Sequence, residues 1–341
     1  MTGNTLGWVI VAFVLYLLMM IAIGAFYAKG NNNSEDYFLG GRKLNGFVAA
    51  LSAQASDMSG WLLMGLPGAI YLTGVGGDGW IAIGLFIGTT LNWLFIATKL
   101  RRYTIRANNS VTLPTYFENR FHDEKKVLMT VSSITIVVFF LVYCASALSA
   151  GGQLFESVFG IDYHVALTIG ALVVLVYTFL GGFTAVCVTD FIQGMLMLVG
   201  ILAVPLFAYH FLTSGGATLS AGLEASGADS ANFLNLMKNG DGSNNIVSVI
   251  SGLGWGLGYF GMPHILVRFM AVRDEKEMTK SKATAISWVA LSLGFAVFIG
   301  ILGRAYLPEL VNGNNEKVFI EMIKKVFTVE MRAPFIAGLF L

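Results

Sequence analysis

The chain has 341 residues, of which 56% are hydrophobic and only 12% charged, and its mean hydropathy is +0.72. Soluble domains carry about 25% charged residues, so this composition excludes an ordinary soluble protein. The apolar runs match spanning helices of about 20 residues rather than the alternating segments of a membrane β-barrel. A net charge of +1 leaves no electrostatic footprint for a nucleic-acid partner. The sequence therefore predicts an all-α, polytopic membrane protein with a single transmembrane domain.

Nine hydrophobic segments are predicted in chain order. They lie near 6–28, 46–71, 79–98, 127–151, 164–181, 185–212, 246–267 and 284–306, with a ninth beginning near 333. The first is too long for the apolar part of a signal peptide and follows no basic segment, so we expect a retained helix. The ninth holds only 334–341. We therefore expect a fragment of a longer protein that stops inside a helix, with a short interfacial tail as the alternative.

The distribution of lysine and arginine predicts an N-terminus outside the cell. With that orientation, 15 of these residues fall in segments on the inner side and six on the outer side. The inner segments are 29–45, 99–126, 182–184 and 268–283. The polar segment 213–245 is then an outer loop rather than a domain, although a small folded cap is an alternative.

The segment 46–71 is apolar at both ends and polar in its middle. The polar residues and helix breakers there are Ser52, Gln54, Ser56, Asp57, Ser59, Gly60, Gly65, Pro67 and Gly68. An aspartate at the centre of a spanning helix costs roughly 2.5–3.5 kcal/mol, and free backbone carbonyls at that depth are tolerated only where they line a cavity. A carboxylate, hydroxyls and carbonyls together suit a hard cation such as sodium. The alternative is a buried polar patch that only fixes helix packing.

A second interrupted segment, 246–267, carries Trp255 and Tyr259 among several glycines before Pro263. A pair of Gly/Pro-interrupted helices at corresponding positions of two halves indicates a transporter binding site. Five helices per repeat would give the halves opposite topology. Trp255 and Tyr259 are four residues apart, so a helix would place them on one face, where they could contact a small amphipathic solute or simply pack.

Several further polar residues lie inside or beside predicted spans. Tyr143 is a polar aromatic within a span, and an ordinary helix contact is its alternative role. Asp190 lies near the inner end of the sixth span, where it would serve either as a step in cation exit or as a helix anchor. Arg268 is expected to be a membrane-edge anchor, and His264 a packed or gating residue. Arg42 lies in a tight turn before 46–71, where a fixed cation could couple to movement of that helix.

No nucleophile triad, phosphate-binding loop or dinucleotide fingerprint occurs in the sequence, so we do not expect an enzyme. Cys144 and Cys187 lie in or beside predicted helices and suggest neither a disulfide framework nor a metal site.

At these residues the sequence resembles the sodium:solute symporter family. The motifs that carry the resemblance span about residues 35–305 and are DYFLGGRKL, LSAQASDMSGWLLMGLPGA, WIAIG, VTLPTYF, FFLVYCASA, YTFLGGFTAV, TDFIQ and GWGLGYFGMPHILVRFMA. The resemblance implies a LeuT-like fold of two inverted five-helix repeats after one extra N-terminal helix. The extra helix would be 6–28 and the first repeat 46–212. The second repeat would begin in 246–341 and be incomplete, ending within its third helix.

The resemblance also implies roles for individual residues. The carbonyls of Ala55 and Met58 would bind sodium, with Asp57 needed for sodium affinity and Ser59 in the same turn. The family places a pair of hydroxyl residues of this site on the helix that is cut at Leu341. The solute site would use Tyr143, Trp255, Tyr259 and Pro263. Arg42 and Asp190 match positions used for coupling and inner-side ion passage.

The function implied is cotransport of sodium and L-proline across the plasma (inner) membrane by alternating access. Expected partners are a small solute and the lipid bilayer, with no obligate protein partner. A symporter for another amino acid or a monocarboxylate is one alternative. A membrane sensor built on the same helices, with a signalling domain after the last helix, is another.

Overall fold

The computed structural model describes residues 3–30, 32–312 and 315–341. Within these ranges the regular structure is helical, with two isolated backbone bridges joining Leu44 to Val272 and Lys238 to Asn244. Five helices are long and apolar enough to cross a membrane, and a bent pair over Ile246–Gly261 and Pro263–Ala271 makes a sixth candidate span. The predicted all-α membrane architecture is therefore confirmed.

The N-terminal helix α1 (Gly3–Ala28) packs along α9 and is followed by two short helical segments, α2 (Ser34–Leu39) and η1 (Gly40–Arg42). We predicted a plain loop at 29–45. Asn33 begins α2 as an N-cap, since its Oδ1 accepts a hydrogen bond of 2.8 Å from the amide of Asp36.

The first interrupted span is built from α3 (Gly46–Gly60), the wide turn η2 (Trp61–Gly65) and α4 (Leu66–Thr73). The break falls at Ser59, whose φ of 45° and ψ of −157° are non-helical. A positive φ is strained for a residue with a side chain. The sequence predicted an interruption here, and the structure places it two residues after Asp57.

The next span is continuous through α5 (Val75–Leu91), η3 (Asn92–Ala97) and α6 (Thr98–Arg106), and is longer than the predicted 79–98. Helix α7 (Leu113–Phe121) lies in the predicted inner loop, and α8 (Val127–Phe159) follows it. Large apolar side chains of α8 such as Val138, Phe139 and Val142 are exposed, as expected of a helix that contacts lipid.

Helix α9 (Tyr163–Ser214) contains both the fifth and the sixth predicted spans. A straight helix of its 52 residues would be about 78 Å long, more than twice the thickness of a hydrocarbon core of about 30 Å. Gly182 interrupts it with a φ of 61° and a ψ of −160°, a conformation that glycine tolerates best. The interruption divides α9 into two legs of spanning length and falls in the predicted turn at 182–184.

The segment after α9 forms a small cap with helices α10 (Leu219–Ala225) and α11 (Ser230–Phe233). Leu223 and Phe233 form a buried cluster with Ala305. We predicted an outer loop rather than a domain, with a small folded cap as the alternative, and the two short packed helices match that alternative. Helices of seven and four residues are too short to show an apolar period in the sequence.

The second interrupted span consists of α12 (Ile246–Trp255), the 3-10 segment η4 (Gly256–Gly261) and α13 (Pro263–Ala271), bent by 46°. The long helix α14 (Glu275–Tyr306) follows it. The remaining segments are η5 (Pro308–Asn312), η6 (Asn315–Lys317), α15 (Val318–Ile323), η7 (Lys324–Glu330) and α16 (Pro334–Phe340).

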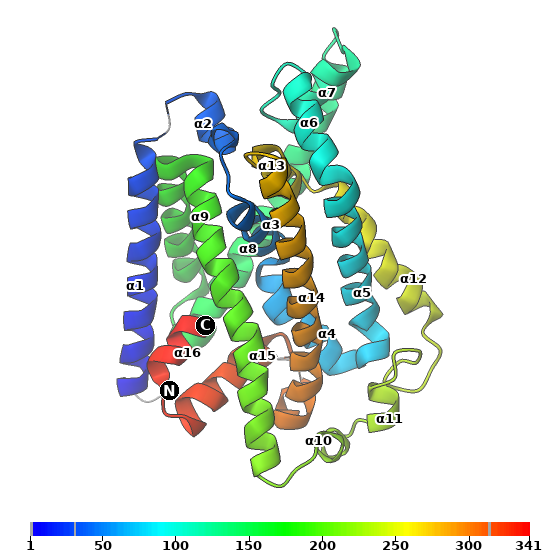
Figure 1. The fold of residues 1–341 in the computed structure, drawn as a ribbon. Helices are drawn as coiled ribbons and strands as arrows, with labels where there is room; N and C mark the ends of the chain where they lie inside the picture. Colours follow the sequence, from blue (N-terminus) through cyan, green and yellow to red (C-terminus); the bar gives the residue numbers. More distant parts are fainter. Residues whose placement is uncertain (1–2, 31, 313–314) are drawn as a thin grey trace.

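The first interrupted span, α3 to α4, lies at the centre of the molecule, whereas α12 of the second lies along one edge (Figure 1). Helix α3 contacts α9, α13 and α14, while α1 and α9 flank it on one side and α5 and α12 lie on the other. Helices α2, α6 and α7 extend from one end of the bundle, and α10 and α11 lie at the opposite end, where the N-terminus also lies. The fold thus brings both breaks into the interior, away from the two ends.

Candidate functional site

Asp57 lies in the last turn of α3 before the break, facing α13. Its side chain is only 4% exposed, and its Oδ1 lies 3.7 Å from Nε2 of His264. Neither Oδ2 of Asp57 nor either ring nitrogen of His264 has a hydrogen-bond partner among the described residues. An ionised carboxylate that is buried without partners is strongly disfavoured unless a cation joins it. A cation therefore fits beside this carboxylate, where its charge would compensate the buried negative charge.

The predicted sodium ligands surround this carboxylate along the same helix. Ala55 is 8% exposed and Met58 only 1%. The carbonyl of Met58 accepts a hydrogen bond from the amide of Trp61, and a carbonyl oxygen retains a second lone pair for another partner. Sodium, like other hard cations, binds such carbonyl, hydroxyl and carboxylate oxygens.

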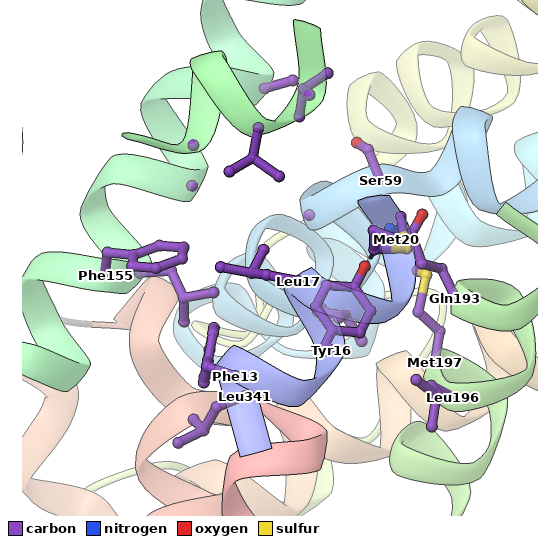
Figure 2. Close-up of a pocket in the computed structure, with 18 of the residues that line it drawn as sticks. Phe13, Tyr16, Leu17, Met20, Ser59, Phe155, Gln193, Leu196, Met197 and Leu341 are labelled. Carbon is purple, nitrogen blue, oxygen red and sulfur yellow. Dashed lines mark hydrogen bonds between the residues drawn. The ribbon is translucent and has the colours of Figure 1, made fainter. Parts of the chain in front are cut away.

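A cavity of about 470 Å³ reaches the break from the side of α1, α8 and α9. Ala55, Ser59 and Gly60 line it, together with Tyr16 and Gln193, which hydrogen-bond to each other. In Figure 2 the side chains of Tyr16, Ser59 and Gln193 lie together on one side of the cavity, with apolar groups around the rest. The cavity thus reaches Ala55 and Ser59 of the predicted sodium site, whereas Asp57 and Met58 are not among the described residues that line it.

The predicted solute residues approach α3 from other helices. Tyr259 is 3% exposed, and its hydroxyl lies 3.8 Å from Sδ of Met58. Trp255 is 49% exposed and stacks on Trp61 with ring centroids 5.7 Å apart. The expectation that Trp255 and Tyr259 share one face was wrong, because α-helical geometry ends at Trp255. A 3-10 segment has three residues per turn and rotates Tyr259 away from Trp255.

Tyr143 and Pro263 complete the predicted solute set. The Tyr143 hydroxyl donates a hydrogen bond of 2.7 Å to the carbonyl of Ser56, and its ring stacks on His264 at 5.4 Å. Pro263 begins α13, where its missing N–H leaves no hydrogen bond unmade. The structure therefore brings Tyr143, Tyr259 and Trp255 against the α3 break. These three residues and Pro263 are not among the described residues that line the cavity of Figure 2.

Arg42 is buried, 8% exposed, in the segment between α2 and α3, with a left-handed φ of 54°. Its guanidinium donates hydrogen bonds to the carbonyls of Met270 and Ser110, both at 2.8 Å, and to Oδ1 of Asn109 at 3.0 Å. Burial lowers the pKa of this guanidinium, and the Glu35 carboxylate 3.7 Å away opposes the shift. Arg42 thus joins the segment before α3 to the end of α13 and to the α6–α7 loop.

Asp190 and Arg268 form an ion pair that the sequence did not reveal. Nη2 of Arg268 lies 2.8 Å from Oδ2 of Asp190, and the two residues are 5% and 8% exposed. The prediction that Arg268 is a membrane-edge anchor was wrong, because the bend before α13 turns this side chain into the interior. Asp190 lay in a predicted span without a partner, whereas Arg268 was assigned to the inner segment directly after one, so no signal in the sequence joined the two.

Two interrupted helices, with buried charges beside the breaks, define a polytopic helical membrane transporter with a LeuT-like fold. The model of the sodium:solute symporter family matches residues 37–341. The chain therefore belongs to the sodium:solute symporter family, whose members are transporters rather than enzymes.

Relatives with assigned functions are similar over nearly the whole chain. A sodium/proline symporter of Salmonella typhimurium is 44% identical over 97% of this chain and 64% of its own length. One of Escherichia coli K12 gives the same three values, and one of Staphylococcus aureus JH9 is 42% identical over 93% of this chain and 60% of its own. The chain thus spans about 60–64% of the length of these relatives.

A solved structure has the same fold. The substrate-bound, outward-open state of a Na+-coupled sialic acid symporter superimposes with a TM-score of 0.78 at 20% identity, covering 98% of this chain and 70% of that one. This likeness confirms the predicted LeuT-like architecture.

Proposed function

We propose that this chain forms the ion- and solute-binding part of a symporter that carries L-proline into the cell together with sodium. The relatives at 42–44% identity are named for that activity. The observation that carries the proposal is the buried Asp57 carboxylate, whose Oδ2 lacks a partner among the described residues at the point where α3 breaks.

In this proposal sodium binds at the α3 break, with the carbonyls of Ala55 and Met58 as ligands, Asp57 as the compensating charge and Ser59 in the same turn. Binding neutralises the carboxylate and orders the turn at Ser59. Since Tyr143 donates to the carbonyl of Ser56 and Tyr259 contacts Met58, ordering this turn also positions two residues of the solute site. That shared turn is the proposed link between the ion and the solute.

The solute site consists of Tyr143, Trp255, Tyr259 and Pro263. The aromatic rings provide apolar faces for a pyrrolidine ring, and the two tyrosine hydroxyls provide polar groups for its charged end. Arg42 and Asp190 serve coupling and ion passage at the inner end. The two five-helix repeats would be 46–212 and the helices from 246 onward, in opposite topology.

The sodium gradient supplies enough free energy for uptake. An inward sodium ion gains about 2.3 kcal/mol per 100 mV of membrane potential, and each tenfold concentration ratio adds about 1.4 kcal/mol. Together these terms support accumulation of about a hundredfold or more at one sodium per solute.

Uptake of radiolabelled L-proline into vesicles that contain the full-length protein tests the proposal. We expect uptake to require an inward sodium gradient and to disappear when potassium replaces sodium. Excess unlabelled proline should compete, whereas sialic acid and monocarboxylates should not. Uptake that is indifferent to sodium would contradict the mechanism, and sodium-dependent uptake of a different solute would correct the substrate.

A further inference from the structure

Three oxygen atoms from two helices converge on the guanidinium of Arg268. Its Nε donates to Oγ of Ser52 at 2.8 Å, and its Nη2 donates to Oγ of Ser56 at 2.7 Å and to Oδ2 of Asp190 at 2.8 Å. Both serine hydroxyls also donate to the same Asp190 oxygen, at 2.7 and 3.0 Å. We call Ser52, Ser56 and Asp190 the oxygen cage.

The oxygen cage is built as a cation site. A carboxylate and two hydroxyls are ligands suited to a hard cation, and here a side-chain cation fills the position. The ring of Phe183 covers the guanidinium at 5.7 Å, and the carbonyl of His264 accepts from Nη1 at 2.6 Å. The Arg268 guanidinium is therefore held by the oxygen cage, by the carbonyl of His264 and by the ring of Phe183, unlike a solvated arginine at a membrane edge.

The oxygen cage and the guanidinium that it holds together join three helices. Ser52 and Ser56 belong to α3, Asp190 to α9, and Arg268 to α13. Ser52 and Ser56 are four residues apart and so lie on one face of α3, next in sequence to the proposed sodium ligands. Helix α13, which carries Arg268, lies toward the end of the molecule that carries α2, α6 and α7 (Figure 1), the end rich in lysine and arginine.

We propose that Arg268 is a tethered cation that locks the inner end of the transport site. The proposal rests on the proposed function, because it assigns Arg268 as the positioning residue for release on the cytoplasmic side. While the guanidinium occupies the oxygen cage, α3, α9 and α13 are held together and sodium cannot use these oxygens. Opening to the inside requires α3 to separate from α9 and α13, which breaks the contacts to both serines and frees Asp190 to receive the departing ion.

Cys187 provides a native reporter of this opening. It lies on α9 three residues before Asp190 and is completely buried, whereas Cys144, the chain's other cysteine, is exposed on α8. In a full-length background in which Cys187 is the sole cysteine, with Cys144 replaced by alanine, a membrane-impermeant maleimide is added to inside-out vesicles without proline. We expect slow labelling of Cys187, and labelling about tenfold or more faster with Arg268→Gln, a change of roughly 1.4 kcal/mol.

Two further variants separate a lock from a merely structural pair. Arg268→Gln alone leaves an unpaired buried carboxylate, which is strongly destabilising. The double variant Arg268→Gln/Asp190→Asn removes both charges, and we expect it to elute as a folded protein and still label fast. The matched control is Arg273→Gln, because the Arg273 side chain is 57% exposed and pairs only with Asp274 and Glu277 among the described residues. It should label as slowly as the parent.

If the double variant is labelled at the parent's rate, the proposal is wrong, because the inner end would then stay closed without the Arg268–Asp190 ion pair. Equal labelling of Arg268→Gln and Arg273→Gln would overturn it as well. The comparison is made without solute, so its failure is distinct from a failure of the proposed function. A parent protein that takes up no proline would refute the function and leave the labelling comparison intact.

Discussion

Among single residues, Asp57 has the environment that most requires a cation. Its side chain is 4% exposed, with Oδ2 free of partners among the described residues. We expect Asp57→Asn to raise the sodium concentration for half-maximal proline uptake by about tenfold or more, because a loss of roughly 1.4 kcal/mol of attraction has that effect. Asparagine keeps the size and removes only the charge. The measurement is initial uptake against sodium concentration at fixed proline.

The matched control for this change is Asp78→Asn. Asp78 lies in the first turn of α5 and accepts a hydrogen bond of 2.8 Å from Thr73, away from the break. Its replacement should leave the sodium dependence unaltered. If Asp57→Asn also leaves the sodium dependence unaltered, Asp57 has no role in sodium binding.

For single residues, the sequence predicted which buried charge lacks a partner better than it predicted which charges pair with each other. Asp57 was recognisable because a carboxylate in the middle of an apolar segment is costly whatever surrounds it. The partnership of Arg268 with Ser52 and Asp190 was not recognisable, because the pairs are 216 and 78 residues apart in the chain. Only the fold brings such residues together.

Among the helices, the interruptions were predictable from glycine and proline content, but their exact geometry was not. The strained residue in α3 is Ser59, while the adjacent Gly60 has a helical φ of −62°. The 3-10 geometry of η4, which separates Trp255 from Tyr259, also follows from packing rather than from local sequence. Local composition therefore indicates that a helix breaks, and tertiary contacts decide where.

The contact between α5 and α12 depends on glycine. A Cβ atom added at Gly256 would lie 2.2 Å from the carbonyl oxygen of Gly84, and one added at Gly88 would lie 2.2 Å from that of Gly256. Backbone atoms cannot give way as a flexible side chain can. We therefore expect Gly256→Ala to push η4 away from α5, destabilising the protein by about 1–3 kcal/mol and weakening proline binding, because η4 carries Tyr259.

Thermal unfolding in detergent and equilibrium proline binding would measure both effects. Gly254→Ala, two residues earlier at the end of α12, is the control, because nothing lies within 4 Å of its added Cβ. That variant should unfold at the parent's temperature or slightly above it, since alanine favours helix over glycine by up to about 1 kcal/mol. If the two variants lose similar amounts of thermal stability and proline affinity, the close approach of α5 to the backbone at Gly256 does not determine either property.

At the scale of the whole molecule, the elements found at each end of the helix bundle support the orientation predicted from the distribution of lysine and arginine. Helices α2, α6 and α7, which belong to the lysine- and arginine-rich segments, extend from one end of the bundle, and the N-terminus lies at the other end with α10 and α11 (Figure 1). The predicted inner segments therefore share one side in three dimensions. The spans themselves were predictable from hydropathy, whereas α2 and α7 were missed because helices of six and nine residues are too short to stand out from a loop.

This arrangement predicts that the α7 end faces the cytoplasm and that the N-terminus and the cap face outward. Two single cysteines test it in a cysteine-free background of the full-length protein, which includes Cys144→Ala and Cys187→Ala. Lys125→Cys lies in the exposed turn after α7, and Met237→Cys lies in the segment after α11, where the native side chain is 63% exposed. A membrane-impermeant maleimide added to intact spheroplasts should label position 237 and spare position 125. Inside-out vesicles should show the reverse. We expect this result because positively charged loops are retained in the cytoplasm. The opposite labelling pattern would invert the topology and place Arg42 and Arg268 on the outer side. Labelling of both positions from one side of the membrane would contradict the fold.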